Sequence, residues 1–462
     1  MKKSIWILWF LVVANVSFAQ MPNTLSNSDK VYGLSKFWQE VNYNFVYLDK
    51  VDREKWESDY KQLIAEVQET SNDYEYYRLL QRFCASLKDG HTNVYFPESL
   101  DSLIYNTWFG KYRLFLKNID GKAIVVRTNL SKKEEIPIGT EILEVNGIPT
   151  KEYAETYVKP YIASSTDYIL ENNSIAWLLQ SPKGTSYDVR FKKPNGDVFD
   201  LQLTHSEVTE KEVYPPFEDR DLLDFKWLDD KIAYMSLNSF SQLKIDSLFL
   251  EKLPELRNAK KLIVDLRNNG GGSTGIGTYI LQYLTHDKEL RGSVSQSRLH
   301  IPSFKAWGKW TQAKDTINGS EETREWNKQA LLSYQDNYYH KFPHYPAEID
   351  LGRKERVVVP TALLIGNNTA SAAEDFLIAA DNQEHMIKIG EPTYGSTGQP
   401  LVFDLPGGGS ARVCTKKDTY PDGREFVGVG IQPDMEVKKT LADYLNHKDP
   451  VLEKAVAYLK QQ

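Results

Sequence analysis

The sequence predicts an α/β core that follows a helical region and a region of short strands. Three observations carry this prediction. Apolar residues recur with a helical period between Asp29 and Lys88, short strands and turns follow from about Tyr105 to Thr204, and strands alternate with helices after Trp227. A chain of 462 residues is long enough for roughly three domains of about 150 residues each.

The composition narrows the classes of function. With 41% hydrophobic and 26% charged residues the chain is globular, and a net charge of −7 without a basic tail argues against binding of nucleic acid. Cys84 and Cys414 are the only cysteines, which gives neither a disulfide framework nor a metal quartet. The eight histidines show no zinc-enzyme spacing, so we expect no metal or organic cofactor.

The first 19 residues are typical of a secretory signal peptide. Lys2 and Lys3 precede an apolar run at 5–13, and small residues at Ser17 and Ala19 predict cleavage after Ala19. The alternative is an uncleaved membrane anchor, for which the run is short. We therefore expect a secreted protein, in the periplasm of a bacterium.

A helical domain is predicted over residues 20–104. Leu34, Phe37, Val41 and Phe45 recur at spacings of three and four, and the cluster at 71–73 is typical of a helix break and cap.

The second region is predicted over 105–206 and is rich in strands. A strand run lies at 123–126, an alternating strand at 141–145 leads into an Asn-Gly turn, and the segments 187–191 and 199–203 form a hairpin.

The core is predicted over 207–462. Strands are expected at 232–237, 261–266 and 357–365, and helices at 247–256, 278–284 and 372–380. Residues 295–350 interrupt this alternation with a polar segment rich in Trp and Tyr. Two interpretations stay open for this insertion: a lid over a site, or a surface excursion without function.

A glycine-rich loop follows the strand at 261–266. The three consecutive glycines at 270–272 let backbone N–H groups turn toward one point, where they would bind an anion or a developing oxyanion. The spacing does not fit a nucleotide-binding loop. A flexible turn is the alternative.

Ser371 stands between a predicted strand and a predicted helix. A hydroxyl at the positive end of a helix suits a nucleophile. The alternative is a capping box, because Glu374 follows three residues later.

A serine nucleophile needs a base, and His91 in Asp89-Gly90-His91-Thr92 is the candidate. A surface histidine is the alternative interpretation. Lys416 or Lys417 would compete as base only if burial removed its proton, and two adjacent lysines before Asp418 are typical of a solvated turn. With a histidine base, we expect the pH profile to rise at about 6–7.

Taken together, these segments resemble the tail-specific (C-terminal processing) serine protease family, in its tricorn-like branch. The matching stretches keep the order of the family along nearly the whole chain: 87–92, 139–147, 262–272, 369–374, 390–399 and 428–434. The resemblance implies a helical N-terminal region, a PDZ-like module over 105–206, and a crotonase-like core over 207–462.

The resemblance also implies roles. Ser371 matches the nucleophile, the N–H of Gly271 or Gly272 and that of Ala372 match the oxyanion hole, and His91 matches the base of the tricorn-like branch.

Two positions depart from the pattern. Ser396 stands where the Ser/Lys branch has its lysine, so that dyad is excluded here. Val427 stands where many relatives have a glutamate. Glu425 lies two residues earlier, on the same face if the segment is a strand, from where it would orient a partner.

The expected function is that of a secreted serine endopeptidase acting on peptides or unfolded proteins. The PDZ-like module would add the peptide as a strand and hold its C-terminal carboxylate. Two alternatives stay open: a catalytically inactive peptide-binding protein on the same fold, and a hydrolase of esters or other amides, against which the absence of Gly-x-Ser-x-Gly argues. Cys84 and Cys414 are predicted to be free, buried and in separate domains.

Overall fold

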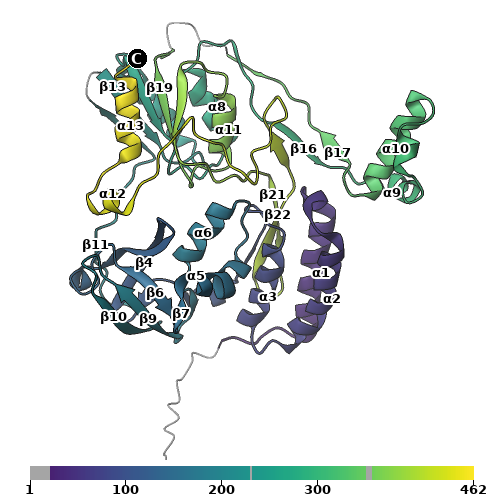
Figure 1. Cartoon of the computed structure of the whole chain (residues 1–462). Coiled ribbons are helices and arrows are strands. Elements are labelled where there is room, and N and C mark those ends of the chain that lie inside the picture. The colour runs from purple at the N-terminus through teal and green to yellow at the C-terminus, as the bar shows by residue number, and fades with distance from the viewer. Residues whose placement is uncertain (1–20, 229–230, 350–355) are drawn as a thin grey trace, which may run out of the picture.

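We describe a computed structural model of the chain that covers residues 21–228, 231–349 and 356–462. The predicted signal peptide lies outside the described residues. Helices gather at the N-terminal end, a curved antiparallel sheet forms the second region, and a sheet between helices forms the third (Figure 1).

Three helices form the N-terminal region: α1 (Asn27–Asn44), α2 (Arg53–Glu66) and α3 (Asp73–Ala85). Their N-caps, Ser26, Asp52 and Asn72, each accept a backbone N–H. The apolar positions with helical spacing are buried here, which confirms the predicted pattern.

A hairpin from the C-terminal half completes this helical region. Strand β22 (Ser410–Cys414) pairs with β21 (Pro400–Asp404) and with β1 (Asn93–Tyr95), which directly follows the turn of His91. Cys84 and Cys414 are both free and buried in the same hydrophobic cluster. The prediction of buried free thiols is confirmed, whereas their assignment to separate domains is wrong, because β22 crosses into the helical region.

The second region is an antiparallel sheet in the order β10-β9-β6-β5-β4-β3. Asn146 and Gly147 both have positive φ, 52° and 73°, as the turn after β6 requires. Short helices α5 (Thr150–Tyr153) and α6 (Asp167–Ala176) cover this sheet. The strands are β3 (Trp108–Phe109), β4 (Tyr112–Ile119), β5 (Lys122–Asn129), β6 (Glu141–Val145), β9 (Ser186–Lys192) and β10 (Val198–Thr204).

The third region has a six-stranded sheet in the order β12-β13-β14-β19-β20-β24, parallel except for β12. Helices α7 (Lys244–Leu256), α8 (Thr274–Gln282) and α11 (Ala372–Ala379) pack on one face, and α13 (Pro450–Leu459) packs on the other (Figure 1). The strands are β12 (Leu223–Trp227), β13 (Ile232–Leu237), β14 (Lys261–Asp265), β19 (Thr361–Ile365), β20 (Met386–Gly390) and β24 (Met435–Glu436).

The insertion forms a ribbon and a helical hairpin. Strand β16 (Val294–Arg298) pairs with β17 (Tyr339–Lys341) and β23 (Lys417–Thr419). Between β16 and β17, α9 (Pro302–Gly308) and α10 (Glu321–Tyr334) stand away from the body and from α11 (Figure 1). The hairpin therefore does not cover the predicted site in this structure. Its aromatic rings instead pack on one another, at Phe304, Trp307 and Trp326.

Two short strands belong to the sheet of the second region: β7 (Ile148–Pro149) pairs with β6, and β11 (Val213–Tyr214) pairs with β5. Two separate strand pairs are β2 (Ile104–Tyr105) with β8 (Ser181–Pro182), and β15 (Glu289–Leu290) with β18 (Ala347–Glu348). The remaining short helices are α4 (Glu98–Asp101) and α12 (Leu441–Leu445). Within the described ranges, the helices are too short or too polar to cross a lipid bilayer.

Candidate active site

Two loops meet at the carboxyl ends of the neighbouring parallel strands β14 and β19. They are tied to each other by buried hydrogen bonds: the Thr369 hydroxyl donates to the Leu266 carbonyl at 2.9 Å, and the Ala370 N–H donates to the Asn269 carbonyl at 3.0 Å. The Asn269 amide also donates to the Leu237 carbonyl on β13, at 2.9 Å. Because all these partners belong to the core, the sheet itself fixes how the two loops face each other.

The glycine loop is closely packed rather than flexible. Gly271 has φ +98°, and a Cβ there would lie 2.7 Å from the Ser371 Cβ and 2.7 Å from the Ala370 carbonyl oxygen. At Gly272, with φ +137°, a Cβ would lie 2.2 Å from the Phe240 carbonyl carbon. Both conformation and space therefore require glycine at these two positions.

The backbone N–H groups of this loop differ in their partners. The N–H of Gly271 donates to the Asn269 side-chain oxygen at 2.9 Å. Within the part of the chain that the structure describes, the N–H groups of Gly272 and Ala372 have no acceptor. Gly272 and Ala372, rather than Gly271, are thus the donors left available to an incoming anion.

Ser371 has a backbone conformation that residues other than glycine rarely adopt, with φ +55° and ψ −122°. It is the N-cap of α11, and its N–H donates to Glu374 Oε2 at 3.0 Å, so the capping box of the sequence forms. Helix capping accounts for the contact between Ser371 and Glu374 but does not explain the strained backbone of Ser371. Strained backbone of this kind clusters at functional sites.

Glu374 connects Ser371 to a third segment, residues 393–396. Its fully buried carboxyl accepts hydrogen bonds from the Thr393 hydroxyl and from the N–H groups of Gly395 and Ser396, in addition to that of Ser371. Burial raises the pKa of Glu374 to about 8, although these four donors lower it. In the sequence, Glu374 is marked only by its capping-box spacing from Ser371. That spacing does not predict the contacts of Glu374 with Thr393, Gly395 and Ser396.

His91 lies against that third segment. Its Nδ1 is 2.6 Å from the hydroxyl of Ser396, which is fully buried, and its Nε2 has no hydrogen-bond partner among the residues described. The preceding N–H, of Gly90, donates to the Ser165 hydroxyl at 2.9 Å. Burial, helped by the positive charges of Arg412 and Lys416, lowers the pKa of His91 to about 4. The imidazole is therefore neutral at neutral pH.

The two lysines do not form a solvated turn, which corrects that interpretation. Both belong to or adjoin β23, with side chains only 26% and 13% exposed at Lys416 and Lys417. Burial alone would lower the pKa of Lys416, but Asp418, at 3.0 Å, and Asp375 outweigh it and raise that pKa. A lysine held in its protonated form is not a base.

Glu425 lies outside this group. Its carboxylate is 45% exposed and pairs with Lys50, at 3.2 Å, and with Lys417. Residues 424–427 form no strand, so the argument that a two-residue shift keeps the same face does not apply. The expectation that Glu425 orients a catalytic partner finds no supporting contact.

The structure thus brings together four of the predicted site residues: Ser371, Gly271, Gly272 and Ala372. The His91 imidazole contacts the Ser396 hydroxyl, and the Glu374 carboxyl accepts the backbone N–H groups of both Ser396 and Ser371. The described residues hold no group of three or more His, Cys, Asp or Glu side chains placed to bind a metal ion.

Three comparisons relate the chain to known peptidases. Residues 231–437 match the model of peptidase family S41. The chain is 22% identical over 441 residues to the carboxyl-terminal-processing protease of Picosynechococcus sp., covering 94% of this chain and 89% of that protein. It is 24% identical over 275 residues to the carboxy-terminal processing protease CtpA of Bacillus subtilis, covering 59% of this chain and 46% of CtpA.

Among solved structures, mature CPAF complexed with lactacystin shares the fold. The TM-score is 0.65 at 14% sequence identity, over 94% of this chain and 99% of that one. Residues 231–437 of this chain are therefore a peptidase family S41 domain, and the chain is a serine-type peptidase related to the carboxyl-terminal processing proteases.

Proposed function

We propose that this chain is a secreted serine endopeptidase with Ser371 as nucleophile and His91 as general base. One observation carries the assignment: the Glu374 carboxyl accepts the N–H of Ser371 and that of Ser396 on the same oxygen, while the Ser396 hydroxyl holds Nδ1 of His91. A single buried side chain thereby links the strained serine to the histidine. Ser396, which stands in the place of the lysine of the Ser/Lys branch, acts as a positioning residue.

The steps follow from these contacts. Nε2 of His91 takes the proton of the Ser371 hydroxyl as its oxygen attacks the carbonyl carbon of the peptide. The N–H groups of Gly272 and Ala372 donate to the oxyanion of the tetrahedral intermediate. His91 then passes its proton to the leaving amine, and water hydrolyses the acyl-enzyme by the same sequence of proton transfers. No cofactor enters the balance.

We further propose the division expected from the sequence, except that the β21–β22 hairpin at 400–414 packs with the helical domain: a helical domain at 20–104, a PDZ-like module at 105–206 and a crotonase-like core at 207–462. In this proposal the module captures an unfolded protein or peptide by strand addition. The substrate is cleaved near its C-terminus, the end that the name of one relative, a carboxyl-terminal-processing protease, gives for that protein. Secretion to the periplasm rests on the signal-like residues 1–19.

A fluorophosphonate probe tests the nucleophile. We expect labelling of the native protein at Ser371, and none after heat denaturation or in Ser371→Ala. An inactive peptide-binding protein would show no labelling of the native chain. Digestion of a denatured proteome, with sequencing of the new termini, then separates an endopeptidase from a hydrolase of esters or other amides, which would create no new peptide termini.

A further inference from the structure

A large cavity lies between the helical region and the second region and is lined by residues of both. Its volume is about 1220 Å³, and its wall includes Gly90 and Tyr394, which adjoin His91 and Ser396. Seven further aromatic side chains line it: Tyr74, Tyr95, Phe96, Tyr153, Tyr157, Tyr161 and Trp177. A space of this size and lining suits a peptide segment rather than a single small molecule.

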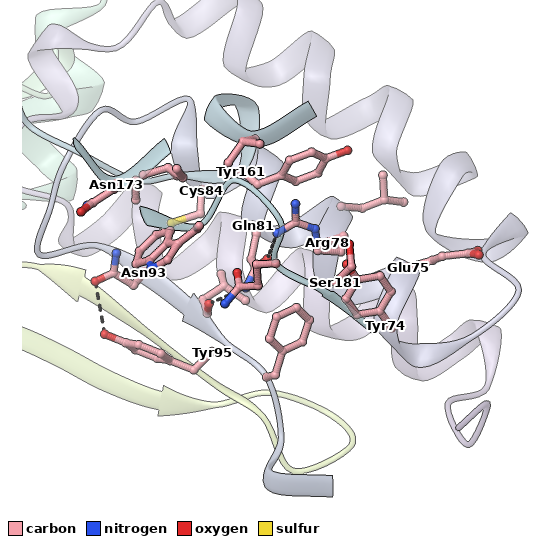
Figure 2. A pocket seen from close by; sticks show the side chains of 18 of the residues that line it. Tyr74, Glu75, Arg78, Gln81, Cys84, Asn93, Tyr95, Tyr161, Asn173 and Ser181 are labelled. Atoms are coloured by element: carbon pink, nitrogen blue, oxygen red, sulfur yellow. Dashed lines mark hydrogen bonds between the residues drawn. The ribbon is translucent and has the colours of Figure 1, made fainter. Parts of the chain in front are cut away.

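Arg78, on α3, places a guanidinium in this cavity without a carboxylate partner. Its Cζ lies 3.7 Å from the centre of the Tyr161 ring, and Nη1 donates to the Gln81 side-chain oxygen at 2.9 Å (Figure 2). Gln81 is itself oriented by a bond to the Val94 carbonyl. Among the residues described, no Asp or Glu lies within ion-pair distance of Arg78.

The nearest acidic side chain is turned elsewhere. Glu75 points away from Arg78 and accepts the N–H of Ser71 at 2.8 Å (Figure 2). The other acidic residues of the wall are either paired, as Glu66 is with Arg82, or exposed at the rim, as are Glu69, Glu98 and Asp101.

A second arginine of this protein shows how a guanidinium that is largely shielded from solvent is usually stabilised. Arg267 is held by two aspartates, Asp265 and Asp449, which raise its pKa against the effect of burial. Burial instead lowers the pKa of Arg78. The groups that raise this pKa, among the residues described, are tyrosines and not carboxylates. A positioned arginine fork, stacked on a ring and lacking an anion, is the geometry that binds a carboxylate in two-point fashion.

We propose that Arg78 binds a carboxylate of the polypeptide substrate inside this cavity, with the adjoining residues of the substrate extending along the aromatic wall toward the His91 turn. This inference rests on the proposed peptidase function and deepens it. The carboxylate belongs either to the C-terminus of the substrate or to an Asp or Glu side chain. The site is formed by α3 and the segment around Tyr161, apart from the strand-addition mode proposed for the second region.

Binding of labelled peptide pools to the full-length Ser371→Ala protein tests this proposal. Three fluorescein-labelled pools of decapeptides, randomised over all residues except Asp and Glu, are compared by anisotropy: one ending in a free carboxylate, one ending in an amide, and one ending in an amide with Glu as last residue. We expect the free-acid pool, the Glu pool or both to bind roughly tenfold more tightly than the plain amide pool. The pool that binds more tightly than the plain amide pool identifies the source of the carboxylate.

Substitution of Arg78 completes the test. Arg78→Gln should remove the preference for the carboxylate pools, and Arg78→Lys should retain part of it, while Arg82→Gln, four residues on along the same helix, should keep it in full. Equal affinity of all three pools for the Arg78 protein, or an equal loss for all pools in Arg78→Gln, would overturn the proposal. His91→Ala should abolish cleavage yet leave the pool preference, so failure of the catalytic assignment and failure of this one are distinguishable.

Discussion

The two halves of the candidate active site are held in different ways. Ser371 and the glycine loop are fixed by hydrogen bonds and close packing within the core, such as those between Asn269, Leu237 and Ala370. The His91 turn is held by two hydroxyl groups from other regions of the chain: that of Ser396 contacts the His91 imidazole, and that of Ser165 accepts the Gly90 N–H. The proposed nucleophile therefore comes with the core fold, whereas the proposed base is brought to it by docking of the helical region.

This difference shows where the enzyme is open to regulation. If the helical region moves relative to the core, the base is displaced from the nucleophile. Activity is then lost although the core stays folded.

Removal of the base should have the largest effect. We expect His91→Ala to lower kcat roughly 10²- to 10⁴-fold, because general base catalysis is lost while the fold stays intact. Lys416→Met should keep most activity, although it lowers the thermal midpoint, since buried Asp418 loses its partner. Steady-state kinetics on one peptide substrate measures both variants. Full activity of His91→Ala would reopen a lysine as base.

On the nucleophile side, Gly271→Ala should damage the site and the core together. The new Cβ meets the Ala370 carbonyl and Ser371, and positive φ alone costs roughly 1–3 kcal/mol of unfolding free energy. We expect loss of fluorophosphonate labelling and a lower denaturation midpoint. Gly270→Ala is the matched control, because a Cβ there has open space. Similar behaviour of the two variants would show that close packing at Gly271 is not needed.

Loss of the hydroxyl that holds His91 should have a moderate effect. Ser396→Ala should lower kcat about tenfold with little change in KM, the value of one hydrogen bond that positions the base. Ser396→Cys, similar in size, should recover part of the rate. Ser165→Ala removes a hydroxyl that contacts the Gly90 N–H and the Asp89 carboxylate of the same turn but not the imidazole, and should lower kcat less. An equal effect of the two alanine variants would assign Ser396 a purely structural role.

The dependence of kcat/KM on pH shows whether the catalytic histidine is buried or exposed. Since the pKa of His91 is lowered to about 4, kcat/KM should rise through about pH 4 and be level at neutral pH, instead of rising at 6–7 as the sequence alone suggests. Arg412→Met removes a nearby positive charge and should shift this rise to higher pH. The unfolded chain binds more protons at His91, so stability contributed by this group falls as pH drops from about 6.5 to about 4. Circular dichroism at each pH controls for that loss.

The smallest effect is expected from deletion of the projecting helices. Replacement of residues 303–337 by a short Gly-Ser linker should leave the length preference for peptide substrates unchanged, because α9 and α10 stand away from α11 (Figure 1). Assay of a ladder of peptides of increasing length measures it. A changed preference in a folded deletion variant would show that the hairpin closes over the site.

Local patterns in the sequence determine much of this protein. Caps and apolar spacing define α1 to α3, the Asn-Gly pair defines the turn after β6, and the buried runs at 232–237 and 261–266 define core strands, because each depends on residues a few positions apart. The same local logic singles out Ser371, His91 and the glycine loop as candidates.

Tertiary structure alone decides how these candidates meet. No local pattern shows that the Gly271 N–H is taken by Asn269, that Ser396 contacts His91 across 305 positions, or that β22 leaves the core to pack beside Cys84. Nor does the sequence show that Lys416 is buried beside Asp418 or that Arg78 faces a cavity unpaired. Burial, pKa and hydrogen-bond partners belong to pairs of distant residues, and only packing of the whole chain creates those pairs.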